Sequence, residues 1–363
     1  MKSTRPEIAI DCRMLNSSGI GTCIKGWLPH ILSELDLPKF TLLGHADEIR
    51  AFSWATSSNV TIRSFTAPIY SLREQLDWHR IPSNEFDLLW VPHLNIPYFS
   101  TCPILVTIHD LIFLRMAKLF GPPARLYAKL LLKRIAVRAN AVFFVSDFTR
   151  REFFQLVGPT SQTSAVIHNG IDRAWFGEIE NSLLPKKISD CPYILFVGNV
   201  KPHKNLPRLV NAFSQVRHKI PHRLVIVGKR DGFITADKAA TRLAESLGNR
   251  VMFTGFLSDD CLRAVVANAK FLVFPSLYEG FGLPPLEALA CGTPVLASRI
   301  PSVVEICGDM VTYFDPYNID DLSDKLVQLA TSPVQRPHTN SLEQYQWSHS
   351  AKQIVSLMKQ LYE

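Results

Sequence analysis

Two carboxylates flank a glycine-rich turn in the second half of the sequence. Glu279 opens the segment E-G-F-G-L-P-P-L-E and Glu287 closes it. The apolar run before the turn has the length of a buried parallel strand, and the paired prolines suit the first turn of a helix predicted over 286–290. Free backbone N–H groups and the helix dipole at such a turn favour an anion, typically a phosphate.

The carboxylate of Glu279 conflicts with a bare phosphate site, because two negative charges repel one another. Its position becomes favourable if it holds hydroxyl donors, and a sugar is the obvious group that carries them. Glu287 has a simpler interpretation as well, since an acid in the first turn of a helix is favourable by itself. The residues between the two carboxylates are candidates for contact with the same bound group: Gly280, Phe281, Gly282 and Leu283.

A basic cluster stands at the end of another apolar run. Lys201, His203 and Lys204 follow a predicted strand and come directly before a predicted helix. Cations oppose the positive end of a helix dipole, so we interpret the cluster as a clamp for a diphosphate. Two residues that follow the ends of strands predicted in the same sheet belong to the same rim: Asn199 and Lys229.

The first half of the chain carries weaker signals. Gly19 and Gly21 occupy a strand-to-helix turn where the backbone can approach a ligand, although a tight turn also requires glycine for structural reasons. A dinucleotide fingerprint would place a third glycine at Ile24, and its absence disfavours a dehydrogenase. His109 and Asp110 end an apolar run, and the carboxyl ends of parallel strands are where open α/β sheets bind ligands.

The composition is that of a soluble globular protein. With 363 residues the chain is long enough for two domains, and 47% hydrophobic with 20% charged residues are ordinary proportions. No apolar run is long enough to predict a membrane-spanning helix, and the N-terminus lacks the apolar core of a signal peptide. Seven cysteines without a C-x-x-C pair favour reduced thiols of the cytoplasm over a disulfide or zinc framework.

Part of the net charge of +7 is concentrated in one segment. Residues 111–146 contain seven basic and no acidic side chains, and a helix predicted across the second half of the segment mixes them with leucines. This helix is either a half-buried surface helix or one that lies on anionic lipid through Arg125, Lys129 and Lys133. Nucleic acid is disfavoured as a partner, because Tyr127 is the only aromatic residue of the helix.

Strand and helix patterns alternate in two successive sets, which predicts two doubly wound α/β domains. A polar stretch with weak patterning separates the two sets and suits a linker. The predicted division is a first domain over 1–178, a linker over 179–192, a second domain over 193–340 and a final amphipathic helix over 341–363.

The pattern E-G-F-G-L-P-x-L-E-A-L-A-x-G-x-P-V resembles the C-terminal signature of retaining GT-B glycosyltransferases of the GT4 family, and the similarity extends over nearly the whole chain. The resemblance implies that Glu279 lies by a donor sugar, that Glu287 holds ribose hydroxyls and that Lys204 binds the diphosphate. His109, in the segment T-I-H-D, resembles the family histidine that touches the donor sugar.

The same resemblance implies further contacts and the arrangement of the domains. The first domain would bind the acceptor and the second the donor, and the last helix would cross back to the first domain. The glycine loop of Gly19 and Gly21 would lie beside the diphosphate and the acceptor, and the base would lie near Phe256 and Leu257. Many members carry arginine where this chain has Asn199, and Lys201 or His203 would then replace it.

The resemblance therefore implies an enzyme that moves a sugar from a nucleotide sugar to a hydroxyl with retention of configuration and without a metal. The lack of a D-x-D pair at a strand end agrees with a metal-free site. The segments H-D-L and I-P-S-V-V-E-I-C-G-D resemble bacterial mannosyltransferases of polysaccharide assembly, so GDP-mannose is the first hypothesis for the donor. A glycan or lipid-linked oligosaccharide would be the acceptor, and the enzyme would be cytoplasmic and peripheral to the membrane.

Several alternatives stay open. The donor is alternatively a UDP- or dTDP-sugar, and the GT-B architecture also serves epimerases and inverting transferases. An inverting enzyme needs a general base, for which Asp110 or Asp11 would have to serve. A scaffold that binds a nucleotide sugar at an inactive site is a non-enzymatic alternative, and the joint presence of Glu279, Glu287 and Lys204 argues against it.

Overall fold

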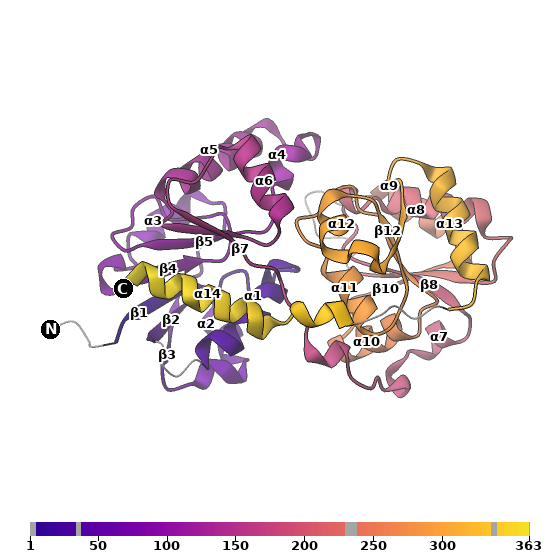
Figure 1. The fold of residues 1–363 in the computed structure, drawn as a ribbon, viewed down its shortest axis with the longest axis horizontal. Coiled ribbons are helices and arrows are strands. Elements are labelled where there is room, and N and C mark those ends of the chain that lie inside the picture. Colours follow the sequence, from indigo (N-terminus) through magenta and orange to yellow (C-terminus); the bar gives the residue numbers. More distant parts are fainter. Residues whose placement is uncertain (1–4, 34–37, 229–237, 335–339, 363) are drawn as a thin grey trace. The chain divides into compact units, whose positions relative to one another are not determined.

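The chain divides into two compact units, shown in Figure 1. The structure is a computed structural model, and the residues it describes are 5–33, 38–228, 238–334 and 340–362. Unit 1 comprises Met1–Arg115, Gly121–Gly170 and Gln344–Glu363. Unit 2 comprises Met116–Phe120 and Ile171–Glu343. Each unit is a doubly wound α/β structure around a parallel sheet, which confirms the predicted fold class.

In the described residues, unit 1 contains a parallel sheet of seven strands. These are β1 (Glu7–Asp11), β2 (Lys39–Gly44), β3 (Val60–Ser64), β4 (Leu88–Val91), β5 (Ile104–Ile108), β6 (Ala141–Phe144) and β7 (Thr163–Val166). Their spatial order is β3-β2-β1-β4-β5-β6-β7, so the direction of winding reverses between β1 and β4. Ile8 of β1 pairs with Phe40 on one side and with Leu88 on the other. Such a reversal is where open α/β sheets bind ligands, outside the carboxyl ends of the strands.

The helices of unit 1 pack on this sheet through apolar faces. They are α1 (Ile20–Leu32), α2 (Ala46–Arg50), α3 (Leu72–Trp78), α4 (Ile112–Arg115), α5 (Pro122–Arg138), α6 (Asp147–Leu156) and α14 (Trp347–Tyr362). Helix α1 buries Ile24, Trp27, Leu28 and Ile31, the spacing of one helical face. Short 3-10 turns of this unit are η1 (Ser53–Thr56) and η2 (Ser83–Glu85).

In the described part of unit 2, six strands form a second parallel sheet in the order β10-β9-β8-β11-β12-β13. These are β8 (Tyr193–Val197), β9 (Arg223–Val227), β10 (Val251–Gly255), β11 (Leu272–Phe274), β12 (Val295–Ser298) and β13 (Thr312–Phe314). The order reverses between β8 and β11, and β13 is an edge strand. The second ligand-binding position of the fold therefore lies after β8 and β11.

Helices cover both faces of this sheet as well. They are α7 (Lys186–Ser189), α8 (Leu206–Val216), α9 (Lys238–Ser246), α10 (Asp259–Ala267), α11 (Leu283–Ala290), α12 (Pro301–Cys307) and α13 (Ile319–Thr331). The 3-10 turns of this unit are η3 (Ala117–Leu119), η4 (Arg173–Trp175), η5 (Asn181–Leu183), η6 (Pro202–Lys204), η7 (Gly248–Arg250), η8 (Gly308–Met310) and η9 (Asn340–Gln344), whose last residue belongs to unit 1.

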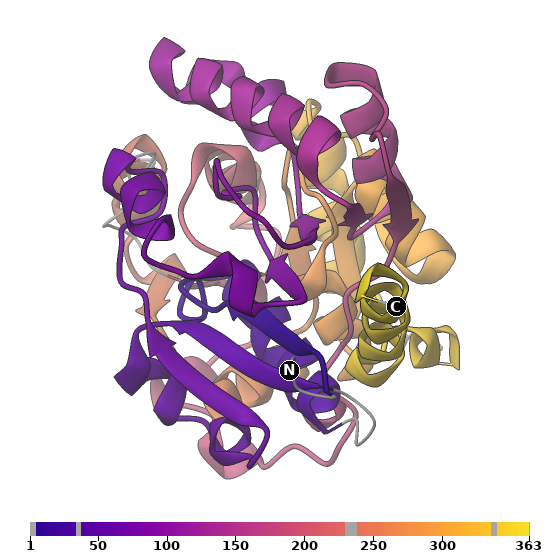
Figure 2. The same cartoon turned by 90° about the vertical axis from the view of Figure 1, so that its left-hand side faces the viewer.

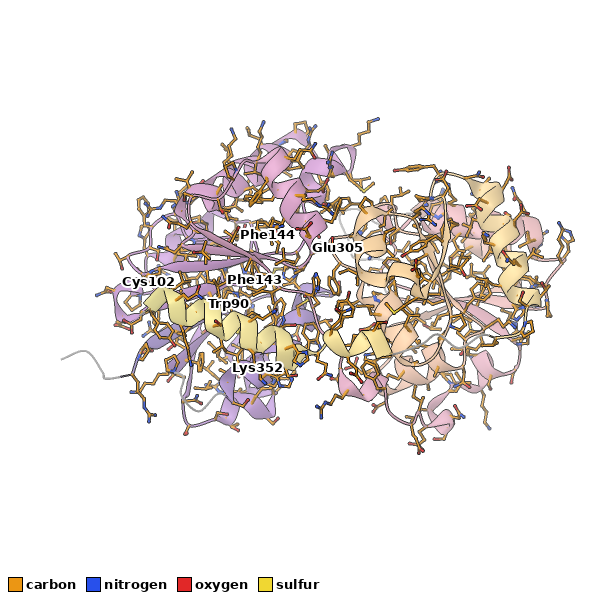
Figure 3. The ribbon with its side chains drawn as sticks, in the orientation of Figure 1. Trp90, Cys102, Phe143, Phe144, Glu305 and Lys352 are labelled. Carbon is orange, nitrogen blue, oxygen red and sulfur yellow. The ribbon has the colours of Figure 1, made fainter. Side chains whose placement is uncertain are left out.

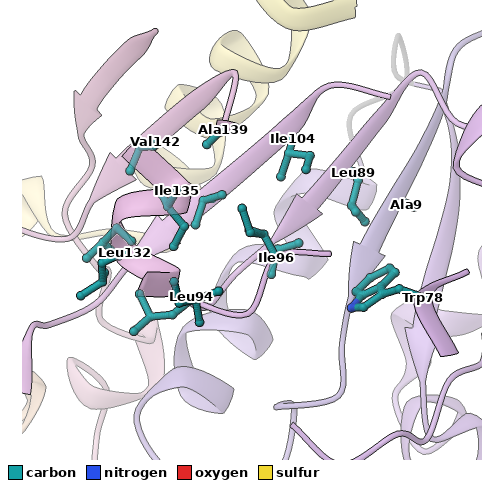
Figure 4. Close-up of a cluster of buried hydrophobic side chains, with 14 of the residues drawn as sticks. Ala9, Trp78, Leu89, Leu94, Ile96, Ile104, Leu132, Ile135, Ala139 and Val142 are labelled. Atoms are coloured by element: carbon teal, nitrogen blue, oxygen red, sulfur yellow. The ribbon is translucent and has the colours of Figure 1, made fainter. Parts of the chain in front are cut away.

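The core of unit 1 lies on both faces of its central strands. Every residue of β4, β5 and β6 is buried, as expected for parallel strands with helices on both sides. Figure 4 shows the cluster on one face, in which Leu132 and Ile135 of α5 lie among residues of the sheet and its loops. Trp90 and Phe143, labelled in Figure 3, contact the ring of Trp27 with centroid separations of 5.8 and 5.6 Å.

The C-terminal helix α14 belongs to unit 1, although the chain reaches it from unit 2. Its first residue, Trp347, packs edge-on against Trp27, with ring centroids 5.8 Å apart. Two glycines make room for it: a Cβ at Gly26 would lie 2.3 Å from the Trp347 ring, and one at Gly170 would lie 2.2 Å from its backbone nitrogen. The predicted return of the last helix to the first domain is confirmed.

Some predicted elements differ from the structure at their ends. Helix α11 begins at Leu283 and not at 286, because proline is well suited to the first helical turn and both prolines fall there. The stretch 179–192 contains η5 and α7 and groups with unit 2.

We expect Gly26→Ala to lower the free energy of unfolding by about 1–3 kcal/mol, the usual cost of overpacking a core. Helix propensity alone would favour alanine by about 1 kcal/mol, so a net loss would show that contact with Trp347 decides. Denaturant unfolding measures the change. Gly177→Ala is the control, since its Cβ meets no atom closer than 3.9 Å. An equal or higher stability of Gly26→Ala would contradict the tight packing of α14.

Candidate active site

The strongest arrangement of charged side chains in unit 2 lies where its sheet reverses. The loop after β8 carries η6 with Lys204, and the loop after β11 carries Glu279. Lys204 Nζ lies 2.6 Å from Glu279 Oε1, and the two side chains are 18% and 16% exposed. Leu277 N donates to His203 O at 2.8 Å and ties the two loops together. Two residues singled out from separate motifs thus form one ion pair.

The charges of this pair are settled by their surroundings. Burial would raise the pKa of Glu279, but Lys204 and His203 beside it hold that pKa below its ordinary value. Glu279 is therefore ionised at neutral pH. Burial and the neighbouring ammonium of Lys204 lower the pKa of His203 to about 4. The predicted clamp of three basic residues accordingly holds two cations at neutral pH, because His203 is uncharged.

Glu287 lies in α11 in a different environment. Helix α11 begins after Gly282, whose φ of 122° lies in the region that favours glycine, and no side chain caps its first turn. Burial and the carboxylates of Asp259 and Asp172 raise the pKa of Glu287 to about 7. Within the described residues, no cation forms an ion pair with it. Such a carboxylate suits hydroxyl donors of a ligand.

The other candidates of unit 2 occupy the same edge of the sheet where they are described. Asn199 and Lys201 are half-buried in the loop after β8, and Phe281 is buried in the core under the turn. After β10, the side chain of Phe256 is 77% exposed, whereas Leu257 is half-buried. Gly280 and Gly282 lie in the turn before α11, and Leu283 is the first residue of that helix. Lys229 lies outside the described residues.

In unit 1, the two glycines of the first turn have a structural explanation. Gly19 has a φ of 77°, and a Cβ at Gly21 would lie 2.3 Å from Leu15 O. His109 Nε2 lies 3.0 Å from the carbonyl of Pro92, which only accepts, so this nitrogen carries the proton. The imidazole stacks on Trp27, with centroids 6.0 Å apart.

His109 is uncharged at neutral pH, since burial lowers its pKa to about 4. The neighbouring Asp110 accepts a hydrogen bond from Ile112 N at 2.9 Å and so caps the start of α4. One carboxylate oxygen of Asp110 therefore has a structural role at the start of α4. Three of the basic residues predicted to meet an acceptor or a membrane lie exposed along α5: Arg125, Lys129 and Lys133.

The sequence analysis missed a buried charge network at the reversal in unit 1. Asp11, at the end of β1, receives hydrogen bonds from Arg13 Nε at 2.9 Å and lies 3.0 Å from His93 Nε2. Arg13 also bridges to Glu74 at 2.7 Å. The signals were D-x-R after one strand and H-x-N after another. Burial would raise the pKa of Asp11, but Arg13 and His93 hold it well below its usual range, which makes Asp11 a poor general base.

No group of three or more His, Cys, Asp or Glu side chains among the described residues is placed to hold a metal ion. No helix among them has the length and apolar character needed to cross a bilayer.

The raised pKa of Glu287 has a consequence for stability. Folding raises this pKa from 4.5 to about 7, so the folded state binds the proton more tightly than the unfolded state. The resulting cost is absent below about pH 4.5 and complete above about pH 7. We expect Glu287→Gln to raise the free energy of unfolding at pH 8, by up to about 3 kcal/mol, and to have no such effect at pH 4.

Denaturant unfolding at the two pH values measures this difference. Glu279→Gln is the matched control, because it removes an ionised partner of Lys204 and should lower stability at pH 8. A destabilised Glu287→Gln at pH 8 would mean that an ionised Glu287 is stabilised by a partner.

Comparison with known proteins agrees with this geometry. Residues 43–175 match the family Glycosyltransferase Family 4, and residues 183–347 match the family Glycosyl transferases group 1. The serotype-specific mannosyltransferase WbdA of Escherichia coli is 31% identical over 64% of this chain, which spans 29% of WbdA. O-antigen chain mannosyltransferase B of Escherichia coli is 27% identical over 61% of this chain and 61% of that protein. The chain thus covers less than two thirds of either relative.

Among solved structures, Anabaena HepE in complex with UDP and glucose superposes with a TM-score of 0.73 over 98% of this chain and all of HepE, at 18% identity. That likeness shows the fold. The two family matches together cover most of the sequence, and both sheets have the parallel order that the fold requires. The chain therefore belongs to the GT4 family of GT-B glycosyltransferases.

Proposed function

We propose that the protein transfers mannose from GDP-mannose to a hydroxyl of a glycan or lipid-linked acceptor in polysaccharide assembly, with retention of configuration. The ion pair of Lys204 and Glu279 carries this proposal. It places a cation and a hydrogen-bond acceptor for a sugar at the reversal of one sheet, beside the uncapped start of α11. Both relatives named above are described as mannosyltransferases, which supports the choice of sugar.

In this proposal the donor diphosphate replaces Glu279 as the partner of Lys204. The phosphate oxygens accept from Lys204 and from backbone N–H groups at the start of α11, so charge that develops on the leaving group is stabilised. Glu279, freed from the lysine, accepts from hydroxyls of the sugar. Glu287 accepts from the ribose hydroxyls.

No step of the proposed reaction requires a metal ion. The bond between the anomeric carbon and the phosphate oxygen breaks, and the acceptor oxygen bonds to that carbon on the same face. The acceptor proton passes to the leaving phosphate, and the products are a glycoside and a nucleoside diphosphate. The two cations of the site, Lys201 and Lys204, carry the electrostatic stabilisation, so EDTA should leave the rate unchanged.

We expect Lys204→Ala to lower kcat/KM by at least about 100-fold, the scale for loss of one preorganised charge. Glu279→Gln should also lower transfer strongly. It should nevertheless bind GDP at least as tightly as the wild type, because the carboxylate that competes for Lys204 is gone. Calorimetric titration with GDP and a transfer assay separate the two effects.

Lys219→Ala is the control, since Lys219 is an exposed lysine of the same unit. If Glu279→Gln weakens GDP binding as much as Lys204→Ala does, the proposal that the diphosphate replaces Glu279 beside Lys204 is wrong.

We also infer that α5 attaches the protein to anionic membranes, where a lipid-linked acceptor would reside. In Figure 2 this helix is the long magenta one on the outside of unit 1. Its exposed residues include three basic side chains, Arg125, Lys129 and Lys133, and three apolar ones, Leu126, Leu130 and Val137. Exposed leucines beside lysines are the residues that an interfacial helix would place against lipid.

We expect sedimentation with anionic vesicles and not with neutral ones, because each basic residue at an anionic surface contributes about 1 kcal/mol. Attachment should be lost near about 0.5 M salt, where screening is short-ranged. Changing Lys129 and Lys133 to Glu should abolish it. The charge-matched control changes Lys219 and Lys352, two exposed lysines elsewhere, to Glu. Equal binding by both double variants would leave α5 as an ordinary surface helix.

A further inference from the structure

The buried network of unit 1 connects three segments that meet where its sheet reverses. Asp11 is the last residue of β1, Glu74 lies in α3 after β3, and His93 and Asn95 follow β4. Arg13 bonds to both carboxylates, with contacts of 2.5 Å to Asp11 and 2.7 Å to Glu74. Buried charges avoid a large desolvation cost only when their hydrogen bonds are all made. The network therefore holds these segments in the one arrangement that makes those bonds.

The network is too deeply buried to meet a ligand itself. Asp11, Glu74 and Asn95 are fully buried, and Arg13 is 8% exposed. Its guanidinium lies 4.2 Å from the centre of the Phe65 ring and 5.4 Å from that of Trp78, which Figure 4 labels. The network therefore has a supporting role, and a ligand would contact only the surface residues that it holds in place.

Tyr70 is the surface residue that this network holds in place. Glu74 Oε2 accepts from Tyr70 N at 2.9 Å and from Asn95 Nδ2 at 2.9 Å. The φ of Tyr70 is 67°, and Asn205 is the other residue besides glycine with positive φ in the described chain. For a bulky side chain this conformation is strained, and strain of this kind persists where surrounding structure enforces it, often at functional sites.

The ring of Tyr70 stands at the centre of an aromatic cluster. It meets Phe113 edge-on at 5.9 Å and Tyr127 edge-on at 6.3 Å, yet 44% of Tyr70 remains exposed. Asp110 precedes Phe113 by three residues at the start of α4, and after burial its charge is the next cause that raises the pKa of Tyr70. Below the cluster, Asn95 Oδ1 is buried without a hydrogen-bond partner in the described residues.

This chemistry selects a class of ligand. The exposed ring of Tyr70 provides an apolar surface, and the carboxylate of Asp110 is able to accept hydrogen bonds from hydroxyl donors. The same carboxylate repels a phosphate or another anion. A neutral pyranose combines one apolar face with a ring of hydroxyl groups and so matches both features.

We propose that Tyr70, with Phe113 and Tyr127 beside it, forms a platform on which a neutral sugar residue of the acceptor lies, with Asp110 accepting from its hydroxyls. Glu74 is a positioning residue, because it holds the backbone of Tyr70 in its strained conformation. The proposal rests on the function proposed above and identifies which surface of unit 1 recognises the acceptor.

Tyr70→Gly tests the platform, because glycine relieves the positive φ while the ring is lost. We expect a melting temperature within a few degrees of the wild type, since the two effects on stability oppose one another. Binding of methyl α-mannoside, measured by saturation-transfer NMR with GDP present, should weaken by about tenfold. Tyr70→Asn, which also tolerates positive φ, serves if the glycine variant folds poorly.

Phe99→Ala is the matched control, because Phe99 is another exposed aromatic residue of unit 1 and should leave sugar binding unchanged. Binding by Tyr70→Gly equal to the wild type, or no binding of methyl α-mannoside by the wild type, would overturn the platform. GDP binding by the wild type in the same samples tests the proposed function separately, so failure of the platform and failure of the donor site are distinguished.

Discussion

The ion pair of Lys204 with Glu279 is the interaction on which the site of unit 2 depends. An ammonium group held near the start of a helix opposes the helix dipole, so it needs an anion close by. Glu279 is that anion, at 2.6 Å. The pair keeps both loops in register at the reversal of the sheet, and its partial exposure leaves it accessible to a competing anion.

The two sheets use a similar device at equivalent positions. Each reverses its winding at one point, between β1 and β4 or between β8 and β11, and in each an acid and a base pair there. Exposure separates their roles. The Asp11 and Arg13 side chains are 0% and 2% exposed, whereas those of Glu279 and Lys204 are 16% and 18% exposed. The first pair is therefore structural support, and the second is suited to chemistry.

Histidine charge is also decided by burial in both units. His109 and His203 each have a pKa of about 4, so neither is a cation at neutral pH. Positive charge for a diphosphate thus has to come from lysine. Glu287 shows the opposite effect on an acid, because burial and two carboxylates raise its pKa to about 7. The proposed donor site consequently contains one ionised carboxylate and one that is close to its midpoint.

Local patterns in the sequence indicated the fold class and the candidates Lys204, Glu279 and Glu287, and the motif that begins at Glu279 carried the resemblance to the family. Strand and helix periodicity and glycine-rich turns are short-range properties. The ionic contact between Lys204 and Glu279 is not such a property, since 75 residues separate them. Nor is the network of Asp11, Glu74 and His93, which the end of β1, helix α3 and the loop after β4 bring together. Only the tertiary structure decides such contacts, because they depend on strand order, which places loops distant in sequence at one edge of a sheet. Charge states follow from them, since burial and neighbouring charges set each pKa.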